Sequence, residues 1–336
     1  MIGKYLGHLS QEDPLYAYMR EEIIPQFGLH IQDVDFRVFQ PPNSHHVYVY
    51  EERQSGMRVV GKFHPPSSKS TLEPISSGQI EYNNLVFLRS LGFDEPPHYV
   101  VRPLGFNRDL GNALIVEYRS DDLLGNIITD AIHFGKTERL YRKLSSLGNF
   151  LASFHNHTAA SWRVNFDISH AYMRRLISSL VVKRGLEKEF SEELDYLCDV
   201  WRTRDFMWED CSVLVHGDVT PSNILAGSWF NITIIDLEWM QWSDRVFDIG
   251  RLCGELMHYF LQGTGDRVAA EPFIGHFLWH YCSSFPDQIR AFKSVTQRAP
   301  FYMALNLLRI ARNSWINRDY RRKLVLEAKK ILRATL

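Results

Sequence analysis

Three oxygen-bearing side chains stand close together in the second half of the chain. The run LVHGDVTPSNIL places Asp218 after an apolar stretch and Asn223 five residues later, and Asp236 follows a second apolar stretch in ITIIDLEW. Magnesium prefers carboxylate and amide oxygens, which it usually shares with water and substrate phosphates. If residues 212–215 and 232–235 pair as a short hairpin, the three side chains converge on one ion.

Each of these residues also has an ordinary structural explanation. Asp and Asn are common in turns because their side chains bond to nearby backbone groups. Asp236 fits that explanation less well, since a carboxylate after an apolar run is costly to bury without a cation. A metal supplies the cation, so the three residues together favour a metal site at which Asp218 remains free to orient a hydroxyl group.

The surrounding motif positions extend this pattern. They are His216, Gly217, Asp218, Asn223, Asp236, Asp244 and Asp248, the last followed by Ile-Gly. The pattern resembles the aminoglycoside phosphotransferase family, which includes choline and ethanolamine kinases and is related to the protein kinases. The resemblance covers nearly the whole chain.

The resemblance implies an ATP- and Mg²⁺-dependent kinase with a protein-kinase-like, two-lobed fold. Asp218 is then expected to accept or orient the proton of the substrate hydroxyl. Asn223 and Asp236 are expected to hold the metal. His216 and Asp248 are expected to support the loop that carries Asp218.

The resemblance also implies a nucleotide site in the first part of the chain. Lys62, in the run VVGKF, is expected to hold the nucleotide phosphates, and Glu81 on the following helix is expected to pair with it. The adenine is expected to lie against the connector at Glu117 and Tyr118, through backbone hydrogen bonds.

The loop over residues 40–46 departs from the protein-kinase pattern. Its sequence, QPPNSHH, contains no glycine, whereas protein kinases cover the phosphates with a glycine-rich loop. Ser44 is a candidate for a phosphate contact, although a polar hairpin tip is the simpler interpretation. How this loop covers the phosphates stays open.

The acceptor is the least defined part of the site. Glu238, Trp239, Trp242 and Glu255 lie near the motif; carboxylates attract amines, and aromatic faces attract quaternary ammonium groups. We expect a small hydroxyl-bearing molecule such as an amino sugar, an aminoglycoside or an amino alcohol. A choline- or ethanolamine-type kinase is the alternative.

Strand signals precede helix signals along the chain. A helix is expected over residues 13–26 and another over 77–91. Aromatic and β-branched runs predict five strands, at residues 34–39, 47–51, 57–63, 99–105 and 113–118. We expect an α+β protein, with a nucleotide-binding lobe over 1–118, formed by a five-stranded antiparallel sheet plus helix, and a mainly helical catalytic and substrate-binding lobe over 119–336.

The composition excludes several other classes of protein. Charged residues make up 23% and hydrophobic residues 45% of the chain, which is typical of globular and not of disordered proteins. A net charge of −1 gives no global field for nucleic acid, and no segment reaches the roughly 20 apolar residues of a membrane span. We expect a cytoplasmic protein that acts on a small molecule, without a nucleic-acid partner. The sequence does not indicate its oligomeric state.

Two other interpretations stay open. The glycine-free loop suggests a non-catalytic pseudokinase that only binds nucleotide, while the presence of Lys62, Asp218 and Asp236 argues against it. Residues 309–336 contain nine Lys or Arg and two acidic residues. This segment could contact nucleic acid or an anionic membrane, although a solvated basic face on a packed helix is the simpler interpretation.

Overall fold

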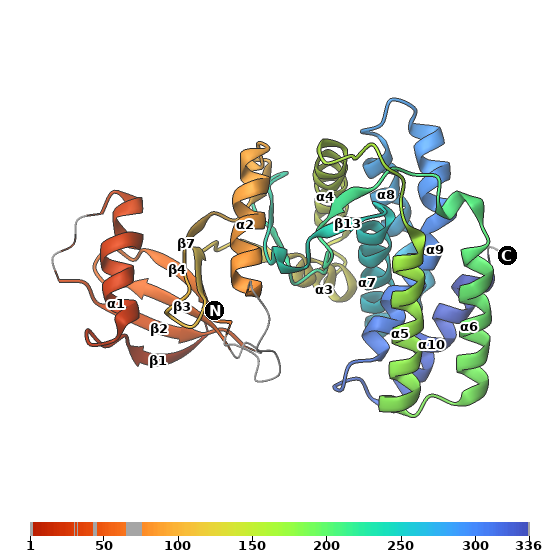
Figure 1. Cartoon of the computed structure of the whole chain (residues 1–336), viewed down its shortest axis with the longest axis horizontal. Coiled ribbons are helices and arrows are strands. Elements are labelled where there is room, and N and C mark those ends of the chain that lie inside the picture. Colours follow the sequence, from red (N-terminus) through yellow and green to blue (C-terminus); the bar gives the residue numbers. More distant parts are fainter. Residues whose placement is uncertain (1–2, 30, 32, 43–45, 65–75, 335–336) are drawn as a thin grey trace. The chain divides into compact units, whose positions relative to one another are not determined.

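The structure is a computed structural model that describes residues 3–29, 31, 33–42, 46–64 and 76–334. The chain divides into two compact units (Figure 1). Unit 1 comprises Met1–Asp121 and Thr233–Glu238, and unit 2 comprises Asp122–Ile232 and Trp239–Leu336. The short segment Thr233–Glu238 therefore carries Asp236 into unit 1, although the chain on both sides of it belongs to unit 2.

Unit 1 is built on a six-stranded antiparallel sheet with the order β1-β2-β3-β4-β8-β7. The strands are β1 (Lys4–His8), β2 (Phe36–Gln40), β3 (Val47–Glu52), β4 (Arg58–Lys62), β7 (Pro103–Asn107) and β8 (Ala113–Glu117). The sheet thus has one strand more than the five expected. The unpredicted strand, β1, is short and mostly exposed, so its sequence KYLGH has none of the apolar alternation that marks a half-buried strand.

The run expected as one strand over residues 99–105 is divided in two. Its first part, β6 (His98–Val100), pairs with β5 (Asp94–Glu95), whereas β7 joins the large sheet. Pro103 begins β7, and a proline at the start of a strand lacks the N–H group that would continue the ladder. The proline therefore separates the two pairings.

Unit 1 also contains two helical segments among its described residues. The helix expected over residues 13–26 is present as α1 (Pro14–Tyr18), a π-helical turn (Met19–Ile23) and a 3-10 turn (Ile24–Phe27). The second, α2 (Ser77–Ser90), begins after Ser76, whose hydroxyl accepts the Gln79 N–H. It buries Leu85 and Leu88 and packs against β6, β7 and β8.

Unit 2 is mainly helical, as expected. Its helices are α3 (Leu124–Phe134), α4 (Thr137–His157), α5 (Phe166–Arg184), α6 (Lys188–Arg202), α7 (Val246–Thr264), α8 (Glu271–Cys282), α9 (Gln288–Ala311) and α10 (Arg318–Arg333). The most extensive contacts between helices join α7 to α9, α9 to α10, and α4 to α8. The Pro300 ring lies inside α9, a helix whose C-terminal half is almost entirely buried.

The short strands of unit 2 correct one expectation. β10 (Val213–Val215) pairs with β13 (Gln241–Ser243), so the expected hairpin between residues 212–215 and 232–235 is wrong. β13 was not predicted because its sequence QWS is short and largely exposed. β9 (Asp122–Leu123) pairs with β11 (Ile224–Ala226).

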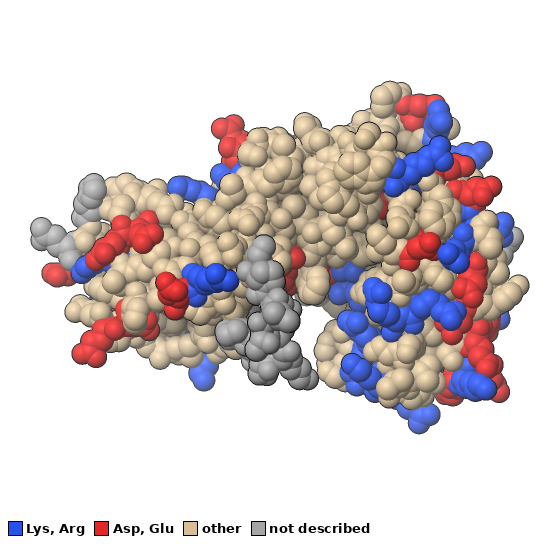
Figure 2. All heavy atoms as spheres, in the orientation of Figure 1, with Lys and Arg blue, Asp and Glu red and all other residues tan. Residues whose placement is uncertain are grey.

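The surface charge agrees with the near-neutral composition. Acidic and basic side chains are interspersed on the face drawn in Figure 2, and the formal net charge is −1. Among the described residues, no helix combines the length and the hydropathy that a membrane-spanning segment needs.

Candidate active site

A tight turn after β10 presents Asp218. All three residues of β10 are buried, and the chain then turns at Gly217, whose φ of +82° lies in the region that side-chain-bearing residues rarely adopt. A Cβ atom at this position would lie 2.1 Å from the carbonyl oxygen of Trp239, so only glycine fits. The backbone N–H of Asp218 donates to His216 Nδ1 at 3.2 Å.

Asp248, near the start of α7, holds this turn. Its carboxylate accepts the backbone N–H of His216 at 2.7 Å and that of Gly217 at 3.0 Å. His155 Nε2 lies 3.2 Å from the same carboxylate, which is completely buried. Burial alone would raise the pKa of Asp248, but hydrogen bonds from His155 and the His216 backbone outweigh it and hold the pKa below its usual range. An ionised, buried carboxylate therefore fixes the turn.

Three side chains contact Asp218 itself. Asn223 Nδ2 donates to both the carbonyl oxygen and Oδ2 of Asp218, each at 3.0 Å. Arg251 Nη1 donates to Oδ1 at 2.5 Å, and Arg309 Nη1 lies 3.4 Å from the same atom. The carboxylate is thus held at both oxygens, while 23% of its side chain stays exposed.

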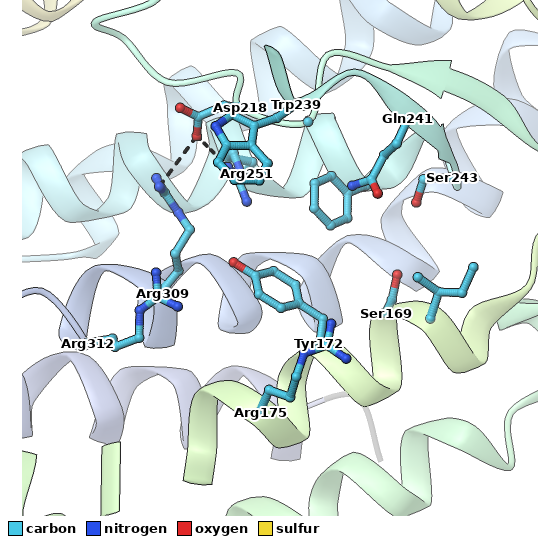
Figure 3. Close-up of a pocket in the computed structure, with 13 residues that line it drawn as sticks. Ser169, Tyr172, Arg175, Asp218, Trp239, Gln241, Ser243, Arg251, Arg309 and Arg312 are labelled. Carbon is cyan, nitrogen blue, oxygen red and sulfur yellow. Dashed lines mark hydrogen bonds and ion pairs between the residues drawn. The ribbon is translucent and has the colours of Figure 1, made fainter. Parts of the chain in front are cut away.

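The exposed part of Asp218 faces a pocket of about 410 Å³ within unit 2 (Figure 3). Tyr172 of α5, Phe247 of α7 and Trp239 form aromatic parts of its wall. A cavity of this volume suits a small organic molecule. Asp218 is therefore placed where it can meet the hydroxyl group of a bound ligand.

A second cluster of charges lies in unit 1. Lys62 Nζ donates to Glu81 Oε1 at 2.6 Å and to Asp236 Oδ1 at 2.7 Å. Burial alone would lower the pKa of Lys62, but attraction to Glu81 and Asp236 outweighs it, so the pKa is raised and the amine stays protonated. The contact between Lys62 and Glu81 is the one expected from the sequence. That Lys62 binds the phosphates of a nucleotide stays a prediction.

The backbone at Asp236 is strained. Its φ of +70° is left-handed, a conformation that costs a residue other than glycine about 1–3 kcal/mol and recurs at functional sites. Asn84 Nδ2 donates to the carbonyl oxygen of the next residue, Leu237, at 2.8 Å. This bond from α2 helps to hold the strained turn in unit 1.

The family is established by a sequence match. Residues 35–282 match the model of the phosphotransferase enzyme family, APH. The chain belongs to this family. It is therefore a phosphotransferase, as the sequence pattern predicts. A comparison with curated proteins gives no match.

Solved structures of similar fold include two kinases of small molecules and one ternary complex. An ethanolamine kinase from Plasmodium vivax has a TM-score of 0.59 at 12% identity, covering 97% of this chain and 91% of the other. A choline kinase from Cryptosporidium parvum has a TM-score of 0.61 at 12% identity, covering 94% of each chain. The streptomycin-ATP-APH(2")-IIa ternary complex has a TM-score of 0.55 at 12% identity, covering 96% and 99%. These likenesses confirm the protein-kinase-like α+β fold.

The two residues expected to hold magnesium, Asn223 and Asp236, each carry a side-chain oxygen, but they belong to different units, so a shared ion stays a prediction. Within the part of the chain that the structure describes, no group of three or more His, Cys, Asp or Glu side chains could hold a metal by itself. Magnesium usually has few protein ligands and fills its shell with water and phosphate oxygens. Asn223 Nδ2 donates to Asp218, and Asn223 Oδ1 accepts the Ser222 hydroxyl at 3.4 Å. In unit 1, Asp236 Oδ1 accepts the Lys62 amine at 2.7 Å.

The other residues expected at the nucleotide are engaged within unit 1. The Glu117 carboxylate accepts the backbone N–H of Arg102 at 2.8 Å, and the Tyr118 ring lies 5.6 Å from the Arg58 guanidinium. These side chains support the sheet, so a contact with adenine through the backbone stays a prediction. Ser44 lies outside the described residues.

The four residues considered for the acceptor are spread over different places. Trp239 lines the pocket together with Asp218. Glu238 belongs to unit 1, and the exposed Trp242 packs against another tryptophan ring at 4.9 Å. Glu255 is buried and accepts hydrogen bonds from two side chains of α9.

The pocket also contains four arginines that sequence analysis did not assign: Arg175, Arg251, Arg309 and Arg312. A partial signal was present on α7, where Arg251 follows Asp248 by three residues, so both lie on one face of the helix. Spacing alone does not show which face meets the pocket, because that depends on how α5, α7 and α9 pack.

Proposed function

We propose that the chain transfers the γ-phosphoryl group of ATP, in the presence of Mg²⁺, to a hydroxyl group of a small molecule. The observation that carries this proposal is the position of Asp218, which is held on a rigid turn and faces a pocket of small-molecule size. Membership of the phosphotransferase family supports it. The descriptions of the similar structures, two of them kinases of small alcohols and one an ATP complex, support the hydroxyl acceptor and the nucleotide.

In the proposed reaction, the acceptor oxygen forms a bond to the γ-phosphorus as the bond between that phosphorus and the ADP oxygen breaks. Asp218 accepts the proton that the hydroxyl loses. Lys62 binds the phosphates, and Glu81 keeps the Lys62 amine in place. Asn223 and Asp236 would hold the magnesium ion, which neutralises phosphate charge when it is bound.

The bonds around Asp218 fit this role. Asn223 fixes Oδ2, and Arg251 and Arg309 approach Oδ1. A carboxylate held at both oxygens loses little orientational freedom when the substrate binds, and positioning of this kind accounts for much of catalysis in phosphoryl transfer.

An assay of nucleoside diphosphate release tests the proposal. Mg-ATP is offered with a panel of choline, ethanolamine, amino sugars, aminoglycosides, sugars and hydroxy acids, and the formation of ADP is measured. Asp218→Asn should lower turnover by at least about a hundredfold, while Mg-ATP still raises the melting temperature of the variant. Equal turnover in the variant and the parent would remove Asp218 from the mechanism.

A further inference from the structure

We infer that the acceptor carries an anionic group, a carboxylate or a phosphate, in addition to the hydroxyl that is phosphorylated, and that Arg175 and Arg312 bind this anion. The inference rests on the proposed function and concerns the same pocket. It departs from the amine-bearing acceptor expected from the sequence. Three features of the pocket carry it.

The first feature is the charge of the pocket wall. Four arginines line the pocket together with a single carboxylate, Asp218. Glu255 lies behind Arg309 and pairs with it at 3.0 Å. Four guanidinium groups less these two carboxylates leave a formal charge of +2 on the pocket.

The second feature is the uneven pairing of the arginines. Arg251 and Arg309 are engaged with carboxylates. Arg312, just after the end of α9 and partly exposed, has no ion pair or hydrogen bond from its guanidinium to any described residue, and neither has the exposed Arg175 on α5. Figure 3 draws both side chains without a hydrogen bond or ion pair to the other residues of the pocket. Two charges of the same sign are thus left at one pocket without a counter-charge. An oxyanion of the ligand would supply it, because the planar guanidinium binds carboxylate and phosphate through paired hydrogen bonds.

Arg251 strengthens this point. Only 5% of Arg251 is exposed, and its Nε atom is buried without a hydrogen-bond partner among the described residues. Burial lowers the pKa of Arg251, and the neighbouring charge of Arg309 lowers it further. A cationic ligand would add to this repulsion, whereas an anion would relieve it.

The third feature is that arginines already lie near two of the aromatic rings. The Arg251 guanidinium lies 5.1 Å from the centre of the Phe247 ring, and that of Arg175 lies 5.7 Å from the centre of the Tyr172 ring. A quaternary or primary ammonium group would need such faces for cation–π binding. Of the three aromatic rings that line the pocket, Trp239 has no arginine guanidinium over it among the described residues, and it is 63% exposed. The pocket therefore favours hydroxy acids and phosphate esters of small alcohols over amino alcohols and amino sugars.

Acceptors that share one scaffold and differ in charge test the inference. Glucose, glucosamine, glucuronate and glucose 6-phosphate form one set; glycerol, serinol, glycerate and glycerol 3-phosphate form a second. We expect the anionic member of each set to have a kcat/KM at least about tenfold above that of the amine, and the comparison of carboxylate with phosphate identifies the source of the charge. A higher kcat/KM for the amines would overturn the inference while leaving the proposed function intact.

Variants of the two unpaired arginines locate the anion. Arg175→Gln and Arg312→Gln should each raise KM for the anionic acceptor by about tenfold to a hundredfold, in line with the loss of a charge-assisted hydrogen bond, and should change kcat less. Arg174→Gln is the matched control, since Arg174 lies next to Arg175 on α5 but pairs with Asp195 at 3.2 Å outside the pocket. An unchanged KM in both pocket variants would overturn the assignment.

A binding measurement decides the matter even if no acceptor of the panel is phosphorylated. Glycerate and glycerol 3-phosphate, without nucleotide, should raise the melting temperature of the parent more than serinol does, and this difference should vanish in the double variant Arg175→Gln/Arg312→Gln. Equal stabilisation of parent and double variant by the anions would contradict the inference. Absence of any phosphorylated product, in contrast, would count against the proposed function.

Discussion

Replacing Asp248 by asparagine should destabilise unit 2 and misplace Asp218. In the parent, Oδ2 and Oδ1 of Asp248 accept the N–H groups of His216 and Gly217 at 2.7 and 3.0 Å. Asparagine has one acceptor oxygen, so one of these buried N–H groups would face an NH₂ group and lose its partner.

The size of the effect follows from those contacts. An unsatisfied buried donor costs about 1–3 kcal/mol, and a hydrogen bond to a charged group contributes about 1.5–3 kcal/mol. Part of this is offset, because asparagine no longer buries a charge. We therefore expect Asp248→Asn to lower the free energy of unfolding by about 2–4 kcal/mol, a large fraction of the roughly 5–15 kcal/mol typical of a folded protein.

Urea unfolding, followed by tryptophan fluorescence and by circular dichroism, measures this loss. Asp319→Asn is the matched control, since Asp319 lies exposed in the first turn of α10 and should change stability by less than about 0.5 kcal/mol. The Asp248 variant should also lose kcat while the melting-temperature increase caused by Mg-ATP is retained. A denaturation midpoint equal to that of the control variant would refute the claim that Asp248 holds the turn.

Three further predictions concern the nucleotide, the turn and pH. Lys62→Met should abolish most of the melting-temperature increase that Mg-ATP gives the parent, because it removes the amine that is proposed to bind the phosphates and that Glu81 and Asp236 hold in place. An undiminished increase would exclude Lys62 from nucleotide binding. Gly217→Ala should cost at least about 2 kcal/mol, since left-handed strain alone costs about 1–2 kcal/mol and the added Cβ meets a backbone oxygen at 2.1 Å; a neutral result in urea unfolding would show that the turn adapts. Burial lowers the pKa of His155 despite its bond to Asp248, so the unfolded chain binds the proton more readily and stability should fall as pH drops below about 6.5. His155→Asn should make the decline of the unfolding midpoint between about pH 6.5 and 5 shallower, and an unchanged slope would exclude His155 as its source.

The large helices and central strands followed from sequence because their signals are local. α2 begins at a serine cap and buries leucines at helical spacing, and β3, β4 and β8 are runs of β-branched and aromatic residues. β1 and β13 were missed because each is short and largely exposed. Their pairing is decided by partners far away in the sequence, which local patterns do not reveal.

The site shows the same division. The spacing of Asp218, Asn223 and Asp236 along the chain predicted them as site residues. The position of Lys62 in a predicted strand did the same for the lysine. The arginines of the pocket come from α5, α7 and α9 and from the residue just after α9, segments that are widely separated in the chain. Each of them looks like a solvated surface charge in the sequence, and only the packing of α5, α7 and α9 around Asp218 gives them a common location.

A single-turnover experiment most directly tests whether Asp218 serves phosphoryl transfer. Excess enzyme is mixed with Mg-ATP labelled in the γ-phosphate and a saturating acceptor, the reaction is quenched at intervals, and the phosphorylated acceptor is quantified beside ADP. The parent should form ADP and phosphorylated acceptor in equal amounts, and Asp218→Asn should form both at least about a hundredfold more slowly although it still binds Mg-ATP. An undiminished rate in the variant, or ADP released with inorganic phosphate and no phosphorylated acceptor in the parent, would contradict the proposed chemistry.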